Sequence, residues 1–150
     1  MDALVVRPAR HEDIDRVLTM YEWLFAPPGS RPPRWDAPRA ADALDGAVAA
    51  EDAVVLVATI GGEFVGFCTA YDELQSVRFG RRVWVEDLAV HPDRRSLGIG
   101  KRLLDEAKNW ARARGADHLE LDSAETRPDA HRFYEREQPS WRSVSYGWEL

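Results

Sequence analysis

The chain has 150 residues, of which 45% are hydrophobic and 31% charged, and its formal net charge is -6. This length and composition predict a single domain over residues 1–150, and they exclude a disordered or fibrous protein. The excess of acidic residues argues against a nucleic acid or an anionic membrane as the main partner, because both are bound through clustered Lys and Arg.

The N-terminal third is predicted to hold one strand and two helices. Leu4–Arg7 is typical of a strand, and apolar residues then recur at helical spacing from Ile14 to Phe25. The segment 26–34 is rich in Pro and Gly and is predicted to be a stiff loop. A second helix is expected after Asp36, a residue type that favours the N-cap position.

The middle of the chain is predicted to form antiparallel strands. A β-branched run over 53–60 is followed by Gly61-Gly62, which suits a two-residue hairpin turn, and by a return strand over 64–71. Residues 75–80 are expected to be a polar connection, and 82–90 a third long strand.

The C-terminal part is predicted to alternate helices and strands. A helix with an apolar stripe runs from about Gly98 to Arg114 and ends at Gly115 in the C′ position. A strand over 118–121 and a helix capped by Thr126 or Arg127 follow, and the alternating tail 141–150 predicts one or two short strands. The resulting order of strands and helices indicates a mixed α/β fold.

The cysteine and histidine residues of the sequence argue against a disulfide and a metal site. The lone Cys68 cannot form an intrachain disulfide, and the four histidines lie at no metal-ligand spacing, so no metal is expected. The sequence lacks a secretory leader and any apolar run near the roughly 18 residues that span a bilayer. A cytoplasmic protein without a membrane partner is therefore expected.

One turn in the sequence is suited to binding phosphate. A strand ending at Leu88–Val90 runs through a basic turn into a helix that has glycines at its start. Free N–H groups at a helix N-terminus favour phosphate, and Gly98 and Gly100 allow the backbone to approach a diphosphate closely. The alternative is structural, with Gly98 tightening a loop and Gly100 allowing close helix packing. The turn alone leaves both interpretations open.

The motif Arg95-Ser96-Leu97-Gly98-Ile99-Gly100 resembles the acetyl-CoA motif of the GNAT superfamily of N-acetyltransferases, Arg/Gln-x-x-Gly-x-Gly/Ala. Leu88-Ala89-Val90-His91-Pro92 is similar to the strand end that precedes this motif in the family. Further along, Ala130-His131-Arg132-Phe133-Tyr134-Glu135 is similar to the family's Ala-x-x-Phe-Tyr-Glu helix. The motifs follow one another in the family's order.

The resemblance implies a mixed, mostly antiparallel twisted sheet flanked by about four helices, and an acyltransferase whose co-substrate is acetyl-CoA. Backbone N–H groups in the turn would hold the diphosphate, and the exposed strand end would pair with the pantetheine amides. The cofactor-binding residues implied in this way are Leu88, Ala89, Val90, Arg95, Ser96, Leu97, Gly98, Ile99, Gly100 and Lys101.

The sequence departs from the family pattern at several positions. Ser96 stands where the family commonly has Gly. Arg127 occupies a position where an Asn often contacts the cofactor, so Arg127 is expected to replace that contact with a salt bridge to phosphate. After Glu135 the family's Leu-Gly-Phe turn is replaced by the residues 136–141, which leaves the geometry of the final hairpin open.

Two residues are candidates for catalysis. The resemblance makes Tyr134 the acid that protonates the leaving thiolate, and the alternative is a ring that only packs with Phe133. The attacking amine must be neutral, so a carboxylate or an ordered water must take its proton. Because side chains alternate along a strand, only one of Glu86 and Asp87 is expected to face a given side. The resemblance favours Glu86 as the base, and a solvated or salt-bridged carboxylate is the alternative.

The acceptor site is expected across the sheet from the cofactor, between the loop 26–34, Trp35 and Tyr71. Several acidic residues are either counter-charges for a cationic amine or ordinary surface residues, namely Asp72, Glu73, Glu125 and Asp129. The sequence does not identify the acceptor, which is a small-molecule or peptide amine, and it does not decide between a monomer and a homodimer.

The leading hypothesis is therefore an N-acetyltransferase that moves an acetyl group from acetyl-CoA to a primary amine by direct attack. A non-catalytic module of the same fold that binds or senses acyl-CoA is the first alternative. An interaction domain whose glycines are purely structural is the second.

Overall fold

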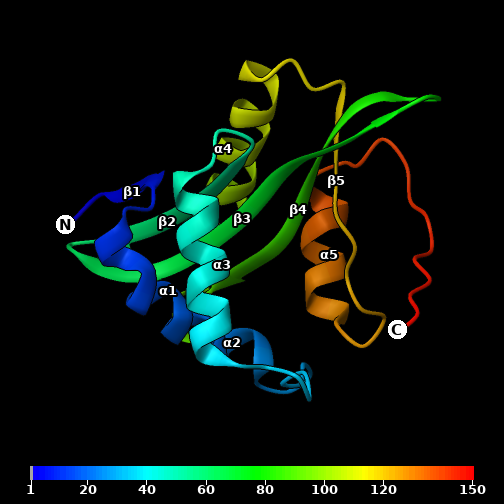
Figure 1. The fold of residues 1–150 in the computed structure, drawn as a ribbon. Helices are drawn as coiled ribbons and strands as arrows, with labels where there is room; N and C mark the ends of the chain where they lie inside the picture. The colour runs from blue at the N-terminus through cyan, green and yellow to red at the C-terminus, as the bar shows by residue number, and fades with distance from the viewer. Residues whose placement is uncertain (1) are drawn as a thin grey trace.

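The computed structural model describes residues 2–150, apart from the side chain of Leu74, and its centre is a five-stranded sheet in the order β1-β2-β3-β4-β5 (Figure 1). Neighbouring strands from β1 to β4 are antiparallel, and β5 is parallel to β4. The strands are β1 (Leu4–Pro8), β2 (Ala53–Ile60), β3 (Glu63–Ser76), β4 (Gly80–Val90) and β5 (His118–Glu120).

Helices cover both faces of this sheet (Figure 1). One face carries α1, α2 and α3, the other carries α4, and α5 lies beside the end of the sheet at β4 and β5. Their bounds are α1 (Ile14–Met20), α2 (Glu22–Phe25), α3 (Ala37–Ala49), α4 (Ile99–Ala113) and α5 (Pro128–Arg136), with 3-10 turns at His11–Asp13 and Pro92–Arg94. The predicted fold class, a mixed and mostly antiparallel sheet flanked by helices, is confirmed.

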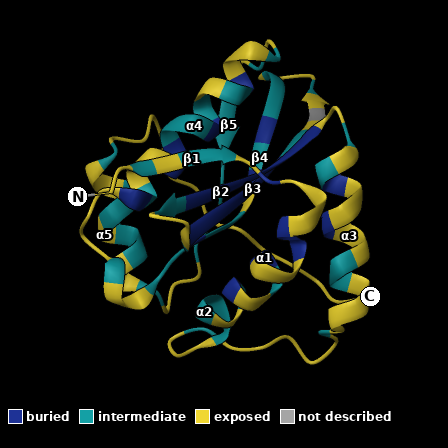
Figure 2. Ribbon diagram, turned by 90° about the vertical axis from the view of Figure 1, so that its left-hand side faces the viewer, coloured by how far each residue is buried: buried dark blue, intermediate teal, exposed yellow. Residues whose placement is uncertain are grey.

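The core forms two layers, one on each face of the sheet (Figure 2). On the α4 face, Ile99 and Leu103 pack against strand residues such as Val65 and Val83. On the opposite face, Val17 of α1 is among the helix residues that pack against the sheet. The helices turn their exposed sides outward, as expected for amphipathic helices on a sheet.

The predicted hairpins are present, but the second is longer than predicted. Gly61 and Gly62 both adopt positive φ, at 57° and 81°, as a two-residue hairpin turn requires. The expected polar connection over 75–80 is wrong, because β3 continues to Ser76 and β4 begins at Gly80. Cross-strand pairing stabilises these polar residues as strand, which overrides their weak intrinsic preference for it.

Two further expectations differ from the structure. The helix expected over 14–25 is divided into α1 and α2 at Tyr21, although the backbone there stays in the α-helical region. The strands expected over 141–150 are wrong, since this tail forms no helix or strand and runs outside the sheet beside α5 (Figure 1). An alternating pattern forms a strand only when an edge is available for pairing.

The pairing of β4 with β5 is short. It joins Arg82, Val83 and Trp84 to His118, Leu119 and Glu120, and beyond this register the edge of β4 has no strand beside it in residues 2–150. The backbone N–H and C=O groups at this edge are therefore available to other partners. None of the helices within the same residues has the length and apolar character needed to cross a bilayer.

Candidate active site

A β-bulge in β4 determines where the candidate catalytic carboxylates lie. Val85 pairs with Ala70 and Asp87 pairs with Thr69, so that Glu86 has no residue opposite it on β3. A bulge of this kind inserts one extra residue and changes the direction in which the following side chains point. Strand irregularities of this type are common beside active sites.

The effect of the bulge is visible in the burial pattern. Before it, Val83 and Val85 pack in the α4 core, and after it Leu88 packs against the same core. The side of the sheet that faces α4 therefore changes from odd to even positions, which leaves both Glu86 and Asp87 on the opposite side. The expectation that only one of these two faces a given side is wrong, because strict alternation holds only in a regular ladder.

Both carboxylates border a cavity of about 430 Å³ between the helices of one face, the bulge and α5. Its wall combines aromatic and acidic side chains from segments that are distant in sequence. The lining residues are Tyr21, Leu24, Phe25, Ser30, Pro32, Trp35, Glu86, Asp87, Leu88, Asp122, Ser123, Ala124, Arg127, Ala130 and Tyr134.

Two hydroxyl groups donate hydrogen bonds to the carboxylate of Asp87. The Tyr21 hydroxyl donates to Oδ2 of Asp87 at 2.7 Å, and the Thr69 hydroxyl donates to the same oxygen at 3.4 Å. Burial raises the pKa of Asp87, and these two hydrogen bonds oppose that shift. Burial and the nearby Asp87 also raise the pKa of Tyr21 far above its usual range, so its hydroxyl remains a donor.

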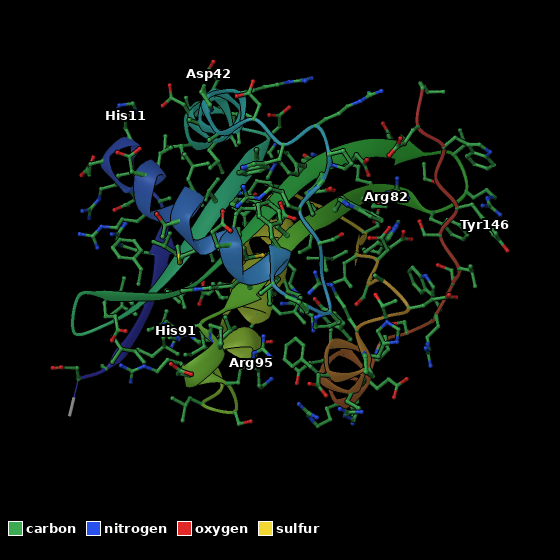
Figure 3. The ribbon with its side chains drawn as sticks, turned by 90° about the horizontal axis from the view of Figure 1, so that it is seen from below. His11, Asp42, Arg82, His91, Arg95 and Tyr146 are labelled. Carbon is green, nitrogen blue, oxygen red and sulfur yellow. The ribbon has the colours of Figure 1, made fainter. Side chains whose placement is uncertain are left out.

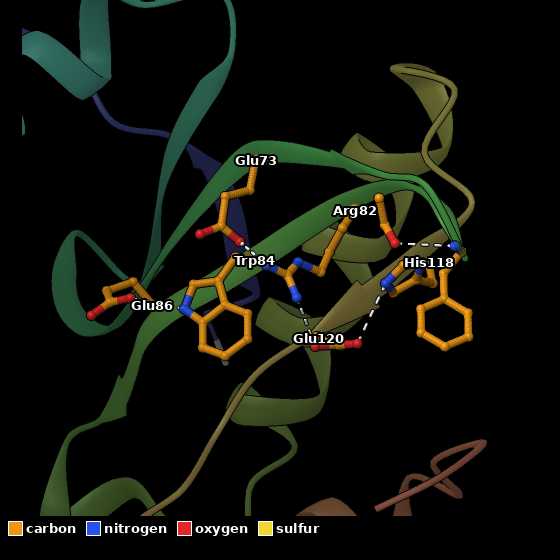
Figure 4. A network of polar contacts seen from close by, with 8 residues as sticks. Glu73, Arg82, Trp84, Glu86, His118 and Glu120 are labelled. Atoms are coloured by element: carbon orange, nitrogen blue, oxygen red, sulfur yellow. Dashed lines mark hydrogen bonds and ion pairs between the residues drawn. The ribbon is translucent and has the colours of Figure 1, made fainter. Parts of the chain in front are cut away.

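Glu86 is more exposed than Asp87 and has a different partner. The indole Nε1–H of Trp84 donates to Oε2 of Glu86 at 2.8 Å (Figure 4). Partial burial raises the pKa of Glu86, the Trp84 hydrogen bond lowers it, and the neighbouring carboxylates Asp87, Asp122 and Glu73 raise it further. A carboxylate with a raised pKa is a better proton acceptor than an ordinary one.

Tyr134 enters the cavity from α5. Burial raises its pKa to about 12, so the hydroxyl is protonated at neutral pH. Within the described residues this hydroxyl has no hydrogen-bond partner, whereas the ring packs against Phe133 with centroids 5.0 Å apart. The geometry thus brings an acid with a free hydroxyl and two carboxylates to one cavity.

Arg127 connects the two sides of this cavity. It is the N-cap residue of α5, and its Nη2 donates to the carbonyl oxygen of Leu24 at the end of α2, at 2.7 Å. Gly29, in the loop after α2, lies so close to this carbonyl and guanidinium that a Cβ there would collide with both. In this structure the Arg127 guanidinium therefore binds α2 beside Gly29 of the Pro-rich loop, and its contact with phosphate stays a prediction.

The turn before α4 presents free backbone donors. Between Arg95 and Lys101, no backbone N–H in the described structure donates to a backbone carbonyl. Gly98, the N-cap of α4, has φ 79°, and a Cβ built on it would have no atom within 4 Å. Ser96 also adopts a positive φ, 65°, which keeps the turn tight. The open space in front of these N–H groups and the N-terminal dipole of a 15-residue helix fit a diphosphate.

Gly100 has a structural role at this turn. A Cβ on it would lie 3.3 Å from the ring of Phe133, so the absence of a side chain lets α5 approach α4. Of the basic side chains, Arg94 pairs with Glu63 and Lys101 with Asp105 and Glu137, which leaves Arg95 without an ion pair inside residues 2–150. Figure 3 places His91 and Arg95 together at this end of the sheet, away from Tyr146 in the tail.

Comparison with known families agrees with this geometry. A model of the acetyltransferase (GNAT) family matches residues 17–138, which is more than half of the chain. The chain belongs to this family. The GNAT match includes the β4 bulge, the turn before α4 and the whole of α5.

Two relatives from Bacillus subtilis (strain 168) are described as uncharacterized N-acetyltransferases. YhdJ is 46% identical over 59 residues, which are 39% of this chain and 42% of YhdJ, and YhfO is 38% identical over 85 residues, which are 57% of each chain. The GNAT chain thus spans about half the length of the curated relatives it matches. The solved structure of the aminoglycoside N-acetyltransferase AAC(6')-Iy in complex with CoA has the same fold, with TM-score 0.83 and 15% identity, covering 100% of this chain and 97% of that one.

Not all the residues expected to bind the acceptor border the cavity. Trp35 lies in the wall, as do Ser30 and Pro32 from the Pro-rich loop. Tyr71 is outside the wall and packs in the core on the same face of the sheet. Three of the expected counter-charges are paired with arginines: Asp72 with Arg81 and Arg114, Glu73 with Arg82, and Asp129 with Arg132.

Sequence reasoning missed Tyr21 and Asp122. Tyr21 belongs to the apolar stripe of its helix, so its pattern indicates packing and gives no sign that its hydroxyl reaches Asp87. Asp122 had a recognisable signal, since it lies two residues after the end of β5 and polar residues at the ends of strands often face a site. Among the described residues, no group of three or more His, Cys, Asp or Glu side chains is arranged to hold a metal ion.

Proposed function

We propose that this GNAT-family chain transfers an acetyl group from acetyl-CoA to a primary amine by direct attack, without a covalent enzyme intermediate. The observation that carries the proposal is that Glu86, Asp87 and Tyr134 line one cavity, and that the strand with both carboxylates leads into the turn with free backbone N–H groups. A base and an acid that border the same cavity are the groups that amide formation from a thioester requires. The same arrangement has no evident purpose in a purely structural domain.

Acetyl-CoA would be held mostly by backbone groups. The free N–H groups from Arg95 to Lys101, which include those of Leu97 and Ile99, would donate hydrogen bonds to the diphosphate oxygens. The unpaired edge of β4 at Leu88, Ala89 and Val90 would pair with the amide groups of pantetheine. The CoA complex of the related fold supports acetyl-CoA as the co-substrate. Arg127 is assigned to the acceptor side in this proposal, because its guanidinium already binds the Leu24 carbonyl.

The reaction would form a C–N bond and break the C–S bond of the thioester. The amine nitrogen attacks the carbonyl carbon, and the proton lost by nitrogen passes to Glu86 directly or through a water. The departing sulfur receives a hydrogen bond from Tyr134. An ammonium acceptor first loses one proton through Glu86 to solvent, and the neutral amine then gives up a second proton that balances the one taken up by the CoA thiol. Because the pKa of Tyr134 is about 12 and that of a thiol about 8.5, Tyr134 stabilises the thiolate mainly by this hydrogen bond.

The acceptor would be a cationic amine, either a small molecule or a peptide. The wall of the cavity carries the carboxylates of Glu86, Asp87 and Asp122, and the charge of Arg127 is directed to a backbone carbonyl. The resulting negative potential attracts an ammonium group but also keeps it protonated, so a base is needed to remove the proton. The related structure named as an aminoglycoside acetyltransferase supports a small-molecule amine.

A thiol-release assay tests the proposal. Purified protein and acetyl-CoA are mixed with a panel of polyamines, aminoglycosides, amino acids and peptides, and free CoA is measured. Release with at least one amine, reduced in Glu86→Gln most strongly at low pH, is the expected result. If CoA raises the melting temperature but no amine causes thiol release, the chain is an acyl-CoA-binding module instead. If CoA causes no shift, the interaction-domain alternative is favoured.

A further inference from the structure

Trp84 contacts the candidate base without bordering the cavity. Its indole Nε1–H donates to Oε2 of Glu86 at 2.8 Å, but Trp84 is not among the described residues that line the cavity wall. An acceptor in the cavity would therefore reach Glu86 and not Trp84. Any effect of Trp84 on the reaction must act through the carboxylate of Glu86.

The Trp84 ring is held in place by Arg82. The guanidinium carbon of Arg82 lies 5.4 Å from the centre of the Trp84 ring, within the range of a cation–π interaction. Nη2 of Arg82 donates to Glu73 at 2.9 Å, and Nη1 donates to Glu120 at 3.3 Å. Arg82 is thus fixed from β3 on one side and β5 on the other, as Figure 4 shows.

Glu86 needs such support because of the bulge. It has no cross-strand partner on β3, and the Trp84 indole is its one hydrogen-bond partner within the described structure. A long carboxylate side chain at an exposed bulge position would otherwise sample several rotamers, with a loss of conformational entropy when it is ordered. The bond to Trp84 occupies Oε2 and leaves Oε1 unbonded.

We propose that Trp84 is a positioning residue that orients Glu86 toward the acceptor amine, with Oε1 as the oxygen that receives the proton. The inference rests on the proposed function, in which Glu86 is the base. It adds a residue that neither the sequence motifs nor the cavity wall indicate.

The charges around Glu86 show what the indole contributes. The titratable groups near Glu86 are Asp87 on its own strand, Tyr71 and Glu73 on β3, and Asp122 after β5, and Glu86 shares the cavity wall with Arg127 at the N-cap of α5 and with Tyr134 on that helix. Burial and the three carboxylates raise the pKa of Glu86, whereas the Trp84 hydrogen bond lowers it. The indole therefore helps to keep Glu86 ionised, and hence able to accept a proton, at neutral pH.

Trp84→Phe tests the inference because it keeps an aromatic ring over Arg82 and removes the N–H donor. With an amine found by the thiol-release screen, the acid limb of the kcat/KM profile should move to higher pH by roughly one unit, the size of one hydrogen bond to a charged group. Trp110→Phe is the matched control, since Trp110 lies on α4 beneath Arg114, and it should leave the limb in place.

Two further measurements make the result specific. In a Glu86→Gln background, Trp84→Phe should cause no additional shift of the limb. A carbon-13 NMR titration of the Glu86 carboxylate in the free protein should show the same upward shift in Trp84→Phe without relying on activity. If Trp84→Phe fails to fold, Arg82→Gln serves instead, because it keeps the indole but removes the cation–π contact that holds it. This variant should shift the titration of Glu86 in the same direction.

The outcomes separate this inference from the proposed function. An unchanged limb and an unchanged titration in Trp84→Phe, with normal thiol release by the wild type, would overturn the role of Trp84. No thiol release by the wild type with any amine would overturn the proposed function and the role of Glu86 as base. In that case an upward shift of the titration would show only the Trp84–Glu86 contact, and the positioning role would be rejected.

Discussion

The hydroxyl of Tyr21 donates a 2.7 Å hydrogen bond to Oδ2 of Asp87, joining the boundary between α1 and α2 to the bulge of β4. The ring of Tyr21 packs on Phe67 of β3, with centroids 4.7 Å apart, so one side chain contacts both the core and the cavity. This contact fixes one part of the cavity wall, because it holds the half-buried Asp87 and the helical side of the wall together.

Asp87→Asn should change how stability depends on pH. Burial raises the pKa of Asp87, so the folded protein holds this proton more tightly than the unfolded chain does. The group therefore favours folding below its unfolded pKa, and that contribution is lost as pH rises through the higher pKa of the folded state. The melting temperature of the variant relative to wild type should accordingly increase from acidic to neutral pH in thermal-shift scans.

Asp42→Asn on α3 serves as the control for Asp87→Asn, because Asp42 is an exposed carboxylate far from the cavity. Its melting temperature relative to wild type should stay nearly constant over the same pH range. A constant difference for Asp87→Asn as well would show that burial does not govern the titration of Asp87.

Gly98→Val should abolish the thermal stabilisation by CoA. A side chain on Gly98 would enter the open space in front of the free N–H groups, where the diphosphate is proposed to bind. Valine is also strained at φ 79°, so the apo protein should lose about 1 to 2 kcal/mol of stability.

Gly62→Val separates strain from loss of binding. Gly62 has φ 81° and open space around it, but it lies in the hairpin turn between β2 and β3. This variant should lose similar stability and keep the full shift of melting temperature with CoA. Normal CoA binding by Gly98→Val would show that the diphosphate lies elsewhere.

Tyr134→Phe should lower kcat by about 10²-fold, the lower end for acid–base groups, and leave CoA affinity unchanged. The ring packing against Phe133 is kept, and the unbonded hydroxyl is removed. The control is Tyr146→Phe, since Tyr146 is 78% exposed in the tail. Steady-state kinetics with a confirmed acceptor give the comparison, and a wild-type kcat in Tyr134→Phe would show that the thiolate leaves without a hydrogen bond from Tyr134.

Trp35→Ala should raise the acceptor KM with little effect on CoA affinity. Trp35 borders the cavity and packs against Phe25 and Tyr21, which places it on the acceptor side and away from the turn before α4. Trp148→Ala, a change at an 80% exposed position, should leave both constants unchanged. A loss of CoA affinity without a change in acceptor KM would contradict this placement.

Local patterns predicted most of the fold. The strand over 53–60, the glycine turn after it and the helix that ends before Gly115 all follow from periodicity and turn residues, and they are present. The extension of β3 to Ser76 depends on pairing with β4, and the tail 141–150 lacks a partner strand. Neither of these facts is encoded in the segment itself.

The site was predictable where backbone geometry governs it. Glycines before a helix predict a tight turn with free N–H groups, and the structure has this geometry at Gly98, whereas its role in binding a diphosphate stays a prediction. The joint placement of Glu86 and Asp87 was not, since a single bulge reverses the alternation on which the prediction depended. The contacts of Tyr21 and Trp84 with these carboxylates arise from packing between separate elements, which no local pattern reports.

The hydrogen bond from Arg127 to the carbonyl of Leu24 connects the binding of the acceptor with the position of α5. An acceptor that displaces Leu24 must also release the N-cap of α5, the helix that carries Tyr134. The free energy of acceptor binding and the free energy of ordering Tyr134 are thus coupled, and such coupling is reciprocal. An amine that fits the cavity without moving Leu24 would leave the N-cap of α5 and Tyr134 in place, so discrimination between amines would be expressed in turnover as well as in binding.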